Sequence, residues 1–256
     1  GINLEDVKSP ECFEIEEQLK ARMRIPVFHD DQHGTAIIVA AAVLNGLELK
    51  GKRIEDVKIC ASGAGAAAIA CLNVLVALGA KHENIWVADK DGLVTHKRND
   101  VNDKWRGQYR RTSDATTLAE VIEGADVFLG LSAAGALKPE MLLKMAPKPL
   151  ILALANPNPE ITPELAKATR PDAMICTGRS DFPNQINNLL VFPGIFKGAL
   201  AARASRIMAE MMIAAAYAIA GRVSPEELSR ECIIPSTFDM GVADVVAEAV
   251  KAHVEH

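Results

Sequence analysis

Short apolar runs alternate with longer segments of helical periodicity along most of the chain. One apolar run covers residues 57–61, a turn of small residues follows at 62–68, and a helix-like segment continues to Leu78. A second apolar run, 85–88, ends on Asp89. Two apolar runs joined by a tight turn and a helix predict a strand–helix–strand unit with parallel strands.

The same alternation continues on both sides of this unit. Upstream, the pattern predicts a helix over 10–24, a short buried strand at 25–28 and a long helix over 35–47. Downstream, strands are expected at 125–131, 150–155 and 173–177, and helices at 115–123, 139–145 and 162–169. Helices are also expected over 194–221 and 241–253, and another should begin at Ser224.

This order of elements predicts the α/β class. We expect a doubly wound, mostly parallel, Rossmann-like sheet with helices on both faces, plus short N-terminal and helical C-terminal appendages. Residues 1–29 do not resemble the start of a domain, and we expect them to be a remnant of a preceding one. Residues 30–222 should form the Rossmann-like domain, and 223–256 a C-terminal helical extension.

Composition narrows the possible functions. The 256 residues are 49% hydrophobic and 24% charged, as in globular proteins, and only 4% aromatic, so the core must be aliphatic. A net charge of −5 gives no reason to expect nucleic acid as a partner. Five scattered cysteines without a CxxC pair favour buried thiols over disulfides or zinc. We expect no membrane span and no signal peptide. We also expect the protein to be cytoplasmic and to form a homo-oligomer, namely a dimer.

The small-residue turn is the first candidate site. Gly63 and Gly65 allow a sharp turn and a close approach of the backbone to a ligand, and alanines keep the following helix start free of bulk. Free N–H groups and the helix dipole there favour a pyrophosphate. Asp89, at the end of the next strand, can accept hydrogen bonds from an adenosine ribose. Dinucleotide binding is therefore predicted, against the alternative of a purely structural turn.

A second candidate site is acidic. Asp30 and Asp31 follow an apolar run, and Glu5 and Asp6 follow another. Adjacent acids are costly unless positive charge is nearby, and oxygen ligands from Glu5, Asp6 and Asp31 would suit Mg²⁺ or Mn²⁺ better than zinc. The alternative is a capped helix start without a metal. The neighbouring His29 and His33 are expected to be satisfied or exposed rather than ligands.

Two further stretches leave their function open. The polar segment 90–111 is rich in lysine and arginine, and it is either a solvated excursion or a source of cations for the 2′-phosphate of NADP. Ser132, Asn156 and the loop after Thr177 follow strands and should face one crevice. That loop carries four amides, Asn184, Gln185, Asn187 and Asn188, which either orient a carboxylate or carboxamide or satisfy the loop backbone.

Several motifs together resemble one family, the malic enzymes, with the bacterial, shorter-subunit branch most similar. They occur in family order, from the first residues to about Ala202. The matching motifs are Leu4-Glu5-Asp6, HDDQHGTA from His29, SGAGAAA from Ser62, LALANPNPE from Leu152 and NNLLVFPG from Asn187.

The resemblance implies oxidative decarboxylation of L-malate to pyruvate and CO₂, with NAD or NADP and Mg²⁺ or Mn²⁺. It implies that Glu5, Asp6 and Asp31 are metal ligands and that Asp30 is a catalytic acid that orients a lysine. It also implies that Asn156 contacts the cofactor and that Asn188 contacts the malate carboxylate. The pyrophosphate would be lined by the residues of the turn, Ala64, Gly65, Ala66 and Ala67.

One departure from the family concerns the catalytic lysine and tyrosine. In the family these residues lie in an N-terminal domain upstream of the Leu4-Glu5-Asp6 match, and no lysine or tyrosine here sits in a matching motif. We therefore expect the cofactor-binding portion of a malic enzyme, with the missing N-terminal domain as its partner. The alternatives are a dinucleotide-binding module without catalysis and, more weakly, an amino-acid dehydrogenase, for which no lysine beside a glycine-rich substrate loop is found.

Overall fold

A computed structural model of the protein describes residues 1–101 and 104–253, so Asn102 and Asp103 of the basic segment lie outside the described residues. The chain forms two compact units. Unit 1 comprises Gly1–Asn45, Gly65–Leu78 and Ile186–His256, and unit 2 comprises Gly46–Ala64 and Gly79–Gln185. The expected segment limits at residues 29 and 222 stay predictions.

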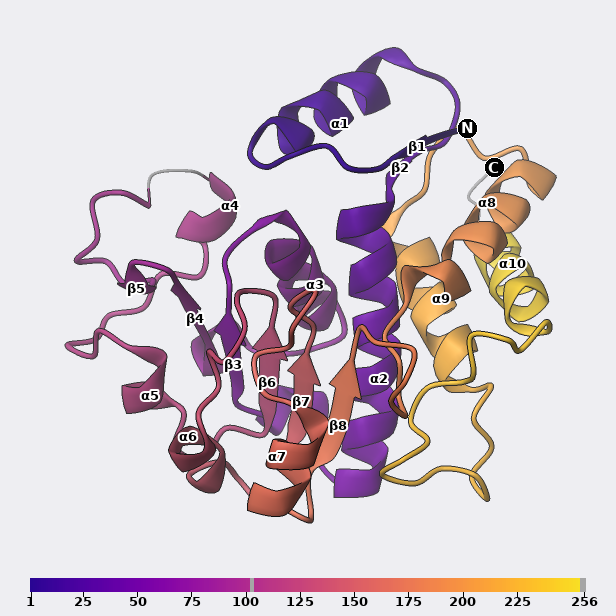
Figure 1. Ribbon diagram of the computed structural model, residues 1–256. Coiled ribbons are helices and arrows are strands. Elements are labelled where there is room, and N and C mark those ends of the chain that lie inside the picture. The colour runs from indigo at the N-terminus through magenta and orange to yellow at the C-terminus, as the bar shows by residue number, and fades with distance from the viewer. Residues whose placement is uncertain (102–103, 254–256) are drawn as a thin grey trace. The chain divides into compact units, whose positions relative to one another are not determined.

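Unit 2 is built on a six-stranded sheet with the order β5-β4-β3-β6-β7-β8. All neighbouring strands are parallel except β5, which is antiparallel to β4, and Figure 1 shows the parallel strands side by side. The strands are β3 (Ile59–Ser62), β4 (Ile85–Asp89), β5 (Gly92–Leu93), β6 (Val127–Gly130), β7 (Leu150–Ala153) and β8 (Met174–Thr177). The strand order reverses at β3, and ligands of such sheets bind at the strand carboxyl ends beside this point.

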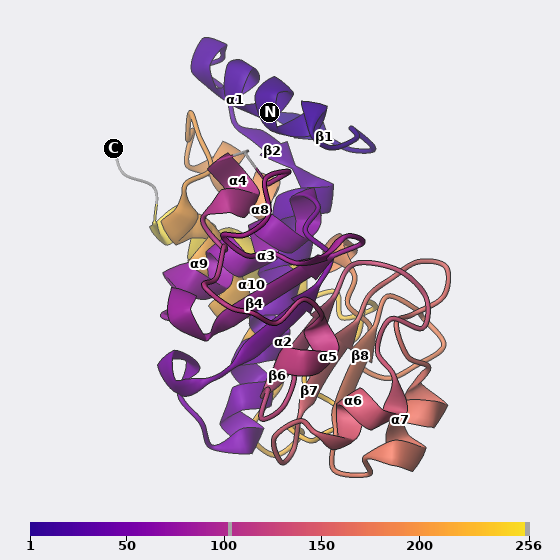
Figure 2. The ribbon, with the colours of Figure 1, turned by 90° about the vertical axis from the view of Figure 1, so that its left-hand side faces the viewer.

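The strands of unit 2 are apolar because both faces of the sheet are covered. Every residue of β6, β7 and β8 is buried, as in parallel sheets generally. On one face, Phe128 and Ile151 pack with Leu142 in a single apolar cluster. The helices of unit 2 are α4 (Lys104–Gly107), α5 (Leu118–Val121), α6 (Pro139–Leu143) and α7 (Pro163–Thr169), with 3₁₀ turns η2 (Ile54–Asp56) and η3 (His82–Asn84). Figures 1 and 2 both place α6 and α7 on one face of the sheet.

Unit 1 begins with two short strands, β1 (Ile2–Leu4) and β2 (Val27–His29), which pair in parallel. A π-helical turn, η1 (Asp30–Gly34), follows β2 and continues directly into α2 (Thr35–Lys50). The other elements of unit 1 are α1 (Glu11–Arg22), α3 (Ala66–Ala77), the 3₁₀ turn η4 (Asn188–Leu190), α8 (Phe192–Ala201), α9 (Ala209–Ala220) and α10 (Val242–Ala252).

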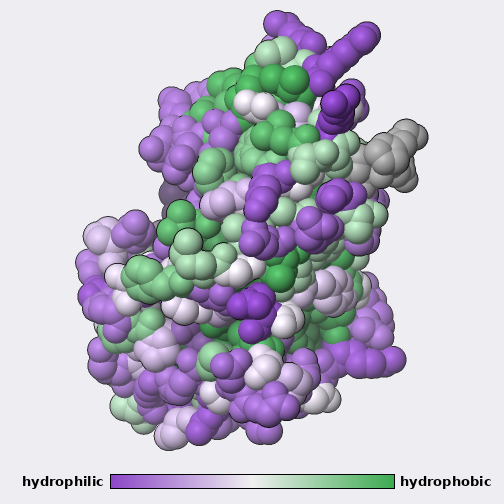
Figure 3. All heavy atoms as spheres, turned by 90° about the vertical axis from the view of Figure 1, so that its right-hand side faces the viewer, coloured by the Kyte–Doolittle hydropathy of each residue, from purple (hydrophilic) through white to green (hydrophobic). Residues whose placement is uncertain are grey.

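Helix α10 packs closely against α8 and α9. A side chain at Gly194 would overlap Val246, and one at Gly198 would overlap the backbone of Ala247, so these glycines allow the two helices to touch. Figure 3 views the side on which α8 and α10 lie in Figure 1, where hydrophobic patches are interrupted by hydrophilic side chains. No helix within the described residues is both long enough and apolar enough for a membrane span.

The C-terminal part of unit 1 is tied to α2 by one buried amide. Asn45 Nδ2 donates hydrogen bonds to Ala220 O at 3.0 Å and to Ile233 O at 2.9 Å. A single side chain therefore holds the end of α9 and the segment that leads to α10.

The predicted α/β class, with a doubly wound, mostly parallel Rossmann-like sheet, is confirmed. Two helix predictions were wrong. The helix expected over 194–221 is two helices, α8 and α9, because Arg203 adopts a left-handed conformation with φ 55°. Ser224 begins only a hydrogen-bonded turn, although Glu227 accepts from its N–H as in a capping box. Strand β5 and helix α4 lie in the basic segment 90–111, for which no regular element was predicted.

A buried ion cluster fixes the entry to the central strands of unit 2. Asp126, which is 1% exposed, precedes β6 and accepts hydrogen bonds from Lys52 Nζ at 2.6 Å and from Lys58 N at 2.9 Å. Lys50 Nζ lies 3.1 Å from its other oxygen. Burial alone would raise the pKa of Asp126, but these partners together lower it below its ordinary value. The cluster joins the end of α2, β3 and β6.

We predict that Asp126→Asn lowers the free energy of unfolding by about 2–4 kcal/mol at pH 7, because it leaves buried lysine charge uncompensated. Since the pKa is lower in the folded than in the unfolded chain, the contribution of Asp126 is present at neutral pH and is lost as the pH falls below about 4. Urea unfolding measures both effects. Asp56→Asn, in an exposed pair with Arg53, is the control and should change little; equal losses in both variants would contradict the prediction.

Candidate functional site

The parallel pairing of β1 with β2 brings two acidic segments together in unit 1. Leu4 pairs with His29, so Glu5 and Asp6 leave β1 beside Asp30 and Asp31, which leave β2. The backbone N–H of Asp6 donates to Asp31 Oδ2 at 2.9 Å, and Asp6 has a left-handed φ of 57°. The structure thus places the four predicted acids at one end of this strand pair.

Asp30 is the most perturbed of these acids. It is 6% exposed, and its Oδ1 has no hydrogen-bond partner within the described residues. Burial, together with the charges of Glu5 and Asp31, raises the pKa of Asp30 to about 6. Gly34 lies directly against this carboxylate, where any side chain would overlap Oδ1. The site therefore holds negative charge that no side chain of the described residues neutralises.

Glu5, Asp6 and Asp31 were the predicted metal ligands. Within the described chain, three carboxylates whose oxygens all lie within 4.8 Å of one another are found at Asp89, Asp91 and Asp100, and the predicted set does not form such a group. Its role stays a prediction. The orphaned oxygen of Asp30 and the uncompensated acids fit a hard divalent cation, which prefers oxygen ligands.

Of the two histidines beside the acids, His33 has a hydrogen-bond partner as expected, whereas His29 is buried and neither of its ring nitrogens has one within the described residues. The expectation that His29 is satisfied or exposed was therefore wrong. His33 Nε2 lies 2.7 Å from Glu16 Oε1 of α1, and Lys20 Nζ lies 2.7 Å from the same oxygen. Burial would raise the pKa of Glu16, but His33 and Lys20 lower it to about 2. His29 is buried, with Nδ1 3.7 Å from Asp31 Oδ2. The contact between Glu16 and His33 joins α1 to η1 and was missed from the sequence because 17 residues separate the partners.

The amides of the loop after β8 divide into two groups. Asn184 donates to Ile175 O, Gln185 donates to Gly178 O, and Asn187 accepts from Leu189 N, so these three satisfy backbone groups. Asn188 is half-buried, and its amide has no hydrogen-bond partner within the described residues. Its Cβ lies against Gly34, where η4 contacts η1. The one uncommitted amide is therefore beside Asp30.

Of the residues of the predicted dinucleotide turn, Gly63 and Ala64 belong to unit 2, and Gly65, Ala66 and Ala67 belong to unit 1. In unit 1, Gly65 is exposed and precedes α3, whose first-turn N–H groups have no acceptor within the helix. Helix α3 packs on η1. The positive end of a helix dipole and the acidic turn η1 are thus parts of the same unit.

In unit 2, Gly63 has a φ of 109°, and a side chain there would overlap Leu131 O, so only glycine fits. Its N–H donates to Ala88 O at 2.7 Å, and Leu131 N–H donates to Ser62 O at 2.8 Å. The turn is therefore anchored to β4 and β6 at the point where the strand order reverses.

Asp89, the predicted ribose acceptor, ends β4 and is already engaged. Its two oxygens accept from Arg98 Nη1 at 2.6 Å and from Arg98 Nη2 at 3.0 Å, and Arg106 Nη1 lies 3.6 Å away. Arg98 also bonds to Asp100, and this guanidinium lies between the acids of the Asp89, Asp91 and Asp100 group. We assign no metal there because arginine supplies the opposite charge.

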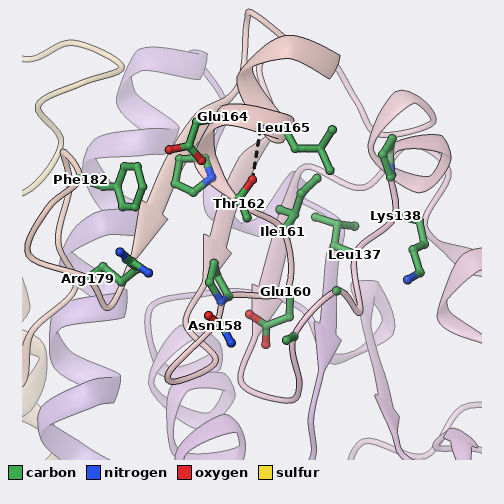
Figure 4. A pocket seen from close by; sticks show the side chains of 15 residues that line it. Leu137, Lys138, Asn158, Glu160, Ile161, Thr162, Glu164, Leu165, Arg179 and Phe182 are labelled. Carbon is green, nitrogen blue, oxygen red and sulfur yellow. Dashed lines mark hydrogen bonds between the residues drawn. The ribbon is translucent and has the colours of Figure 1, made fainter.

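A pocket of about 600 Å³ in unit 2 is lined by the loops that follow β6, β7 and β8. Figure 4 shows Arg179 and Phe182 on one side and Lys138 on the other, with the carboxylate of Glu160 between them. Asn156, the predicted cofactor contact, is exposed in the loop after β7. Glu160 was only part of a quoted motif in the sequence, because nothing local indicated that its carboxylate would be fully buried.

These features define a class of protein. A mostly parallel sheet with a reversal of strand order, a glycine turn at that reversal and an acid at the end of the following strand are characteristic of dinucleotide-binding domains of oxidoreductases.

Comparison with known proteins narrows this class. Residues 32–254 match the family described as "Malic enzyme, NAD binding domain", and the chain belongs to this family. It is 61% identical over 264 residues to an NAD-dependent malic enzyme of Rhizobium meliloti and 54% identical over 271 residues to an NADP-dependent malic enzyme of Haemophilus influenzae. It spans 34% and 36% of the length of these relatives, which in turn cover 98% and 100% of this chain.

Solved structures agree with this assignment. The chain superposes on the NAD-dependent malic enzyme of Thermotoga maritima with a TM-score of 0.89 and 46% identity, covering 98% of this chain and 66% of that one. For the malic enzyme of Pyrococcus horikoshii the TM-score is 0.91 and the identity 44%, with 98% and 60% covered. The resemblance inferred from the motifs is confirmed, and the amino-acid dehydrogenase alternative is wrong.

We predict that Asp30→Asn stabilises the metal-free chain. The pKa of about 6 exceeds the ordinary 3.8, so ionised Asp30 opposes folding, and the penalty grows as the pH rises from about 4 to above 6. Removing the charge should raise the free energy of unfolding at pH 7.5 by at most about 3 kcal/mol. Urea unfolding in chelator measures the gain.

The gain from Asp30→Asn should be absent at pH 4, where wild-type Asp30 is protonated. Asp114→Asn, at a fully exposed carboxylate, is the control and should show no such pH-dependent gain. A variant at Asp30 that is less stable than wild type at pH 7.5 would contradict the assignment of uncompensated charge.

Proposed function

We propose that this chain is the cofactor- and metal-binding part of an enzyme that oxidatively decarboxylates L-malate to pyruvate and CO₂ and reduces NAD⁺ or NADP⁺. The observation that carries the proposal is the composition of unit 1. Four carboxylates, the amide of Asn188 and the N-terminus of α3 all belong to elements that contact η1 or adjoin it. A dinucleotide, a divalent cation and a dicarboxylic acid need these kinds of group.

Each residue of the proposed site has a distinct task. The turn of Gly63, Ala64, Gly65, Ala66 and Ala67 takes the pyrophosphate, and Asn156 contacts the cofactor. Glu5, Asp6 and Asp31 hold Mg²⁺ or Mn²⁺, and the uncommitted amide of Asn188 donates to the malate carboxylate. A divalent cation at that site would stabilise negative charge developing on the substrate during decarboxylation.

Asp30 acts on protons in this proposal. With a pKa of about 6, it can exchange a proton near neutral pH, and it can orient a basic group that reaches it from elsewhere in the protein. The relatives are about three times as long as this chain, and we infer that the part outside it supplies a lysine and a tyrosine for the proton transfers. We further propose a cytoplasmic homodimer.

The metal assignment predicts that Asp31→Asn, in the complete polypeptide, lowers malate-dependent NAD(P)H production by more than about a hundredfold. Mn²⁺ affinity, measured separately by electron paramagnetic resonance, should fall in parallel because an anionic ligand is lost. Asp114→Asn is the matched exposed control and should change neither quantity. An Asp31 variant with wild-type Mn²⁺ affinity would refute the ligand role whatever its rate.

A second candidate function is dinucleotide binding by this chain alone, without catalysis. It is favoured because the chain spans only about a third of the relatives' length. Calorimetry of the isolated chain with NAD⁺ and NADP⁺, followed by a malate turnover assay, distinguishes the two. Binding without turnover supports the module, and turnover by the isolated chain refutes it. Failure to bind either cofactor would contradict both functions.

The choice between NAD and NADP depends on Asp89 in this proposal. An unpaired acid at the end of this strand repels a 2′-phosphate, but Arg98 pairs with both oxygens of Asp89. We predict that Arg98→Ala lowers kcat/KM for NADP relative to NAD by about tenfold, which corresponds to about 1.4 kcal/mol. Arg53→Ala, in an exposed ion pair elsewhere in unit 2, should leave the ratio unchanged. An unaltered ratio in the Arg98 variant would show that Asp89 does not discriminate between the cofactors.

A further inference from the structure

Glu160 is a fully buried carboxylate, 0% exposed, that joins two loops at the carboxyl edge of the sheet in unit 2. Its Oε1 accepts hydrogen bonds from Ser132 N at 2.8 Å and from Ser132 Oγ at 3.1 Å, in the loop after β6. Its Oε2 accepts from Ala155 N at 3.0 Å, in the loop after β7. Asn156, the proposed cofactor contact, is the next residue.

The position of this carboxylate is fixed from several sides. Leu137 N donates to Glu160 O at 3.1 Å, and Gly135 N donates to Pro159 O at 3.2 Å. A side chain at Gly130, the last residue of β6, would overlap the carboxylate. A glycine within a strand weakens the strand. At the end of β6, the absence of a side chain at Gly130 leaves the space that the carboxylate of Glu160 occupies.

Only a carboxylate satisfies all these donors. Ser132 N–H and Ala155 N–H point to different oxygens of Glu160. A glutamine would place its amide donor against one of the two N–H groups, and the lost hydrogen bond would leave a polar group unsatisfied. The two loops therefore keep this spacing only while residue 160 carries two acceptor oxygens.

The network continues to the glycine turn. Ser132 Oγ lies 2.8 Å from Ser62 Oγ. Because the Ser132 hydroxyl donates to Glu160, the Ser62 hydroxyl must donate to Ser132. Ser62 is the last residue of β3 and precedes Gly63. One buried acid thus connects the ends of β3, β6 and β7, at the reversal of strand order where dinucleotides bind.

Stability alone does not account for this arrangement. Within the described residues, no lysine or arginine forms an ion pair with Glu160, and burial of a carboxylate without a cation is costly. An apolar residue at position 160 would avoid that cost but would leave the N–H groups of Ser132 and Ala155 without their acceptor. Glu160 lies at the strand carboxyl ends, where ligands of such sheets bind.

We propose that Glu160 is a positioning residue for the cofactor. It sets the spacing of the three loops so that the Gly63 turn and Asn156 bind the same dinucleotide. The inference rests on the proposed function for the identity of the ligand, but Glu160 itself touches only protein groups in this role. Its replacement should weaken cofactor binding and leave malate binding, which depends on residues of unit 1, unaffected.

The test compares Glu160→Gln with Glu164→Gln in the complete polypeptide. Glu164 is exposed in the first turn of α7 and lines the same pocket, so its variant controls for loss of charge there. We expect Glu160→Gln to raise the KM for the cofactor about tenfold, equivalent to about 1.4 kcal/mol, with the KM for malate within about twofold of wild type. Glu164→Gln should match wild type in both constants.

Ser132→Ala provides a second, milder variant. It removes the hydroxyl links to Glu160 and Ser62 but keeps the backbone N–H bond, so the KM for the cofactor should rise by a few-fold. If Glu160→Gln does not fold, this variant decides the question by the same comparison of the two KM values. A folded variant whose melting temperature falls while both KM values stay at the wild-type level would overturn the proposal, as would an equal rise in both.

Cofactor affinity measured by calorimetry on the same proteins separates this proposal from the reaction itself. A wild-type enzyme that binds the dinucleotide but does not oxidise malate would refute the proposed function and leave the role of Glu160 to be judged from the dissociation constants. The role is supported if Glu160→Gln weakens binding about tenfold, and refuted if Glu160→Gln and Glu164→Gln bind equally well.

Discussion

The parallel pairing of β1 with β2 is the constraint on which unit 1 depends. Only three residues pair on each side, yet this register sends Glu5, Asp6, Asp30 and Asp31 out from the same end. Repulsion between these carboxylates opposes folding, as the raised pKa of Asp30 indicates. A protein tolerates such an arrangement where a cation or a basic side chain compensates it. The raised pKa of Asp30 and its proposed role in proton transfer therefore have the same origin.

Four buried or half-buried acids of the described residues differ in how their charge is compensated. Lysines surround Asp126, one guanidinium pairs with Asp89, and backbone N–H groups hold Glu160. Asp30 has no compensating partner within the described residues. The first arrangement supports the fold, the second pairs the acid at the end of β4 with an arginine, and the third links the loops after β6 and β7. The fourth leaves a reactive group, which accords with the view that unsatisfied charge is kept where chemistry requires it.

The sequence predicted the order of elements and the fold class because apolar runs and turn residues are local signals. Gly63 was recognised as the turn residue for the same reason. The break at Arg203 was missed because residues 199–208, around the break, contain no proline or glycine to mark it. The Arg98 pair with Asp89 and the contacts of Glu160 depend on loops that meet only in the folded sheet, and the amide of Asn188 differs from its three neighbours only in lacking a backbone partner. Proximity of this kind has no signature in periodicity.

The hydrogen bonds of Asn45 to Ala220 and Ile233 have a consequence for biosynthesis. Unit 2 is complete once residue 185 has left the ribosome, but unit 1 lacks the partners of Asn45 until another 50 residues or so have followed. During that interval the apolar faces of α2 and α3 have no C-terminal helices to pack on, and exposed apolar surface in nascent chains promotes aggregation. Nascent-chain chaperones should therefore engage the first helices of this protein for longer than its central sheet.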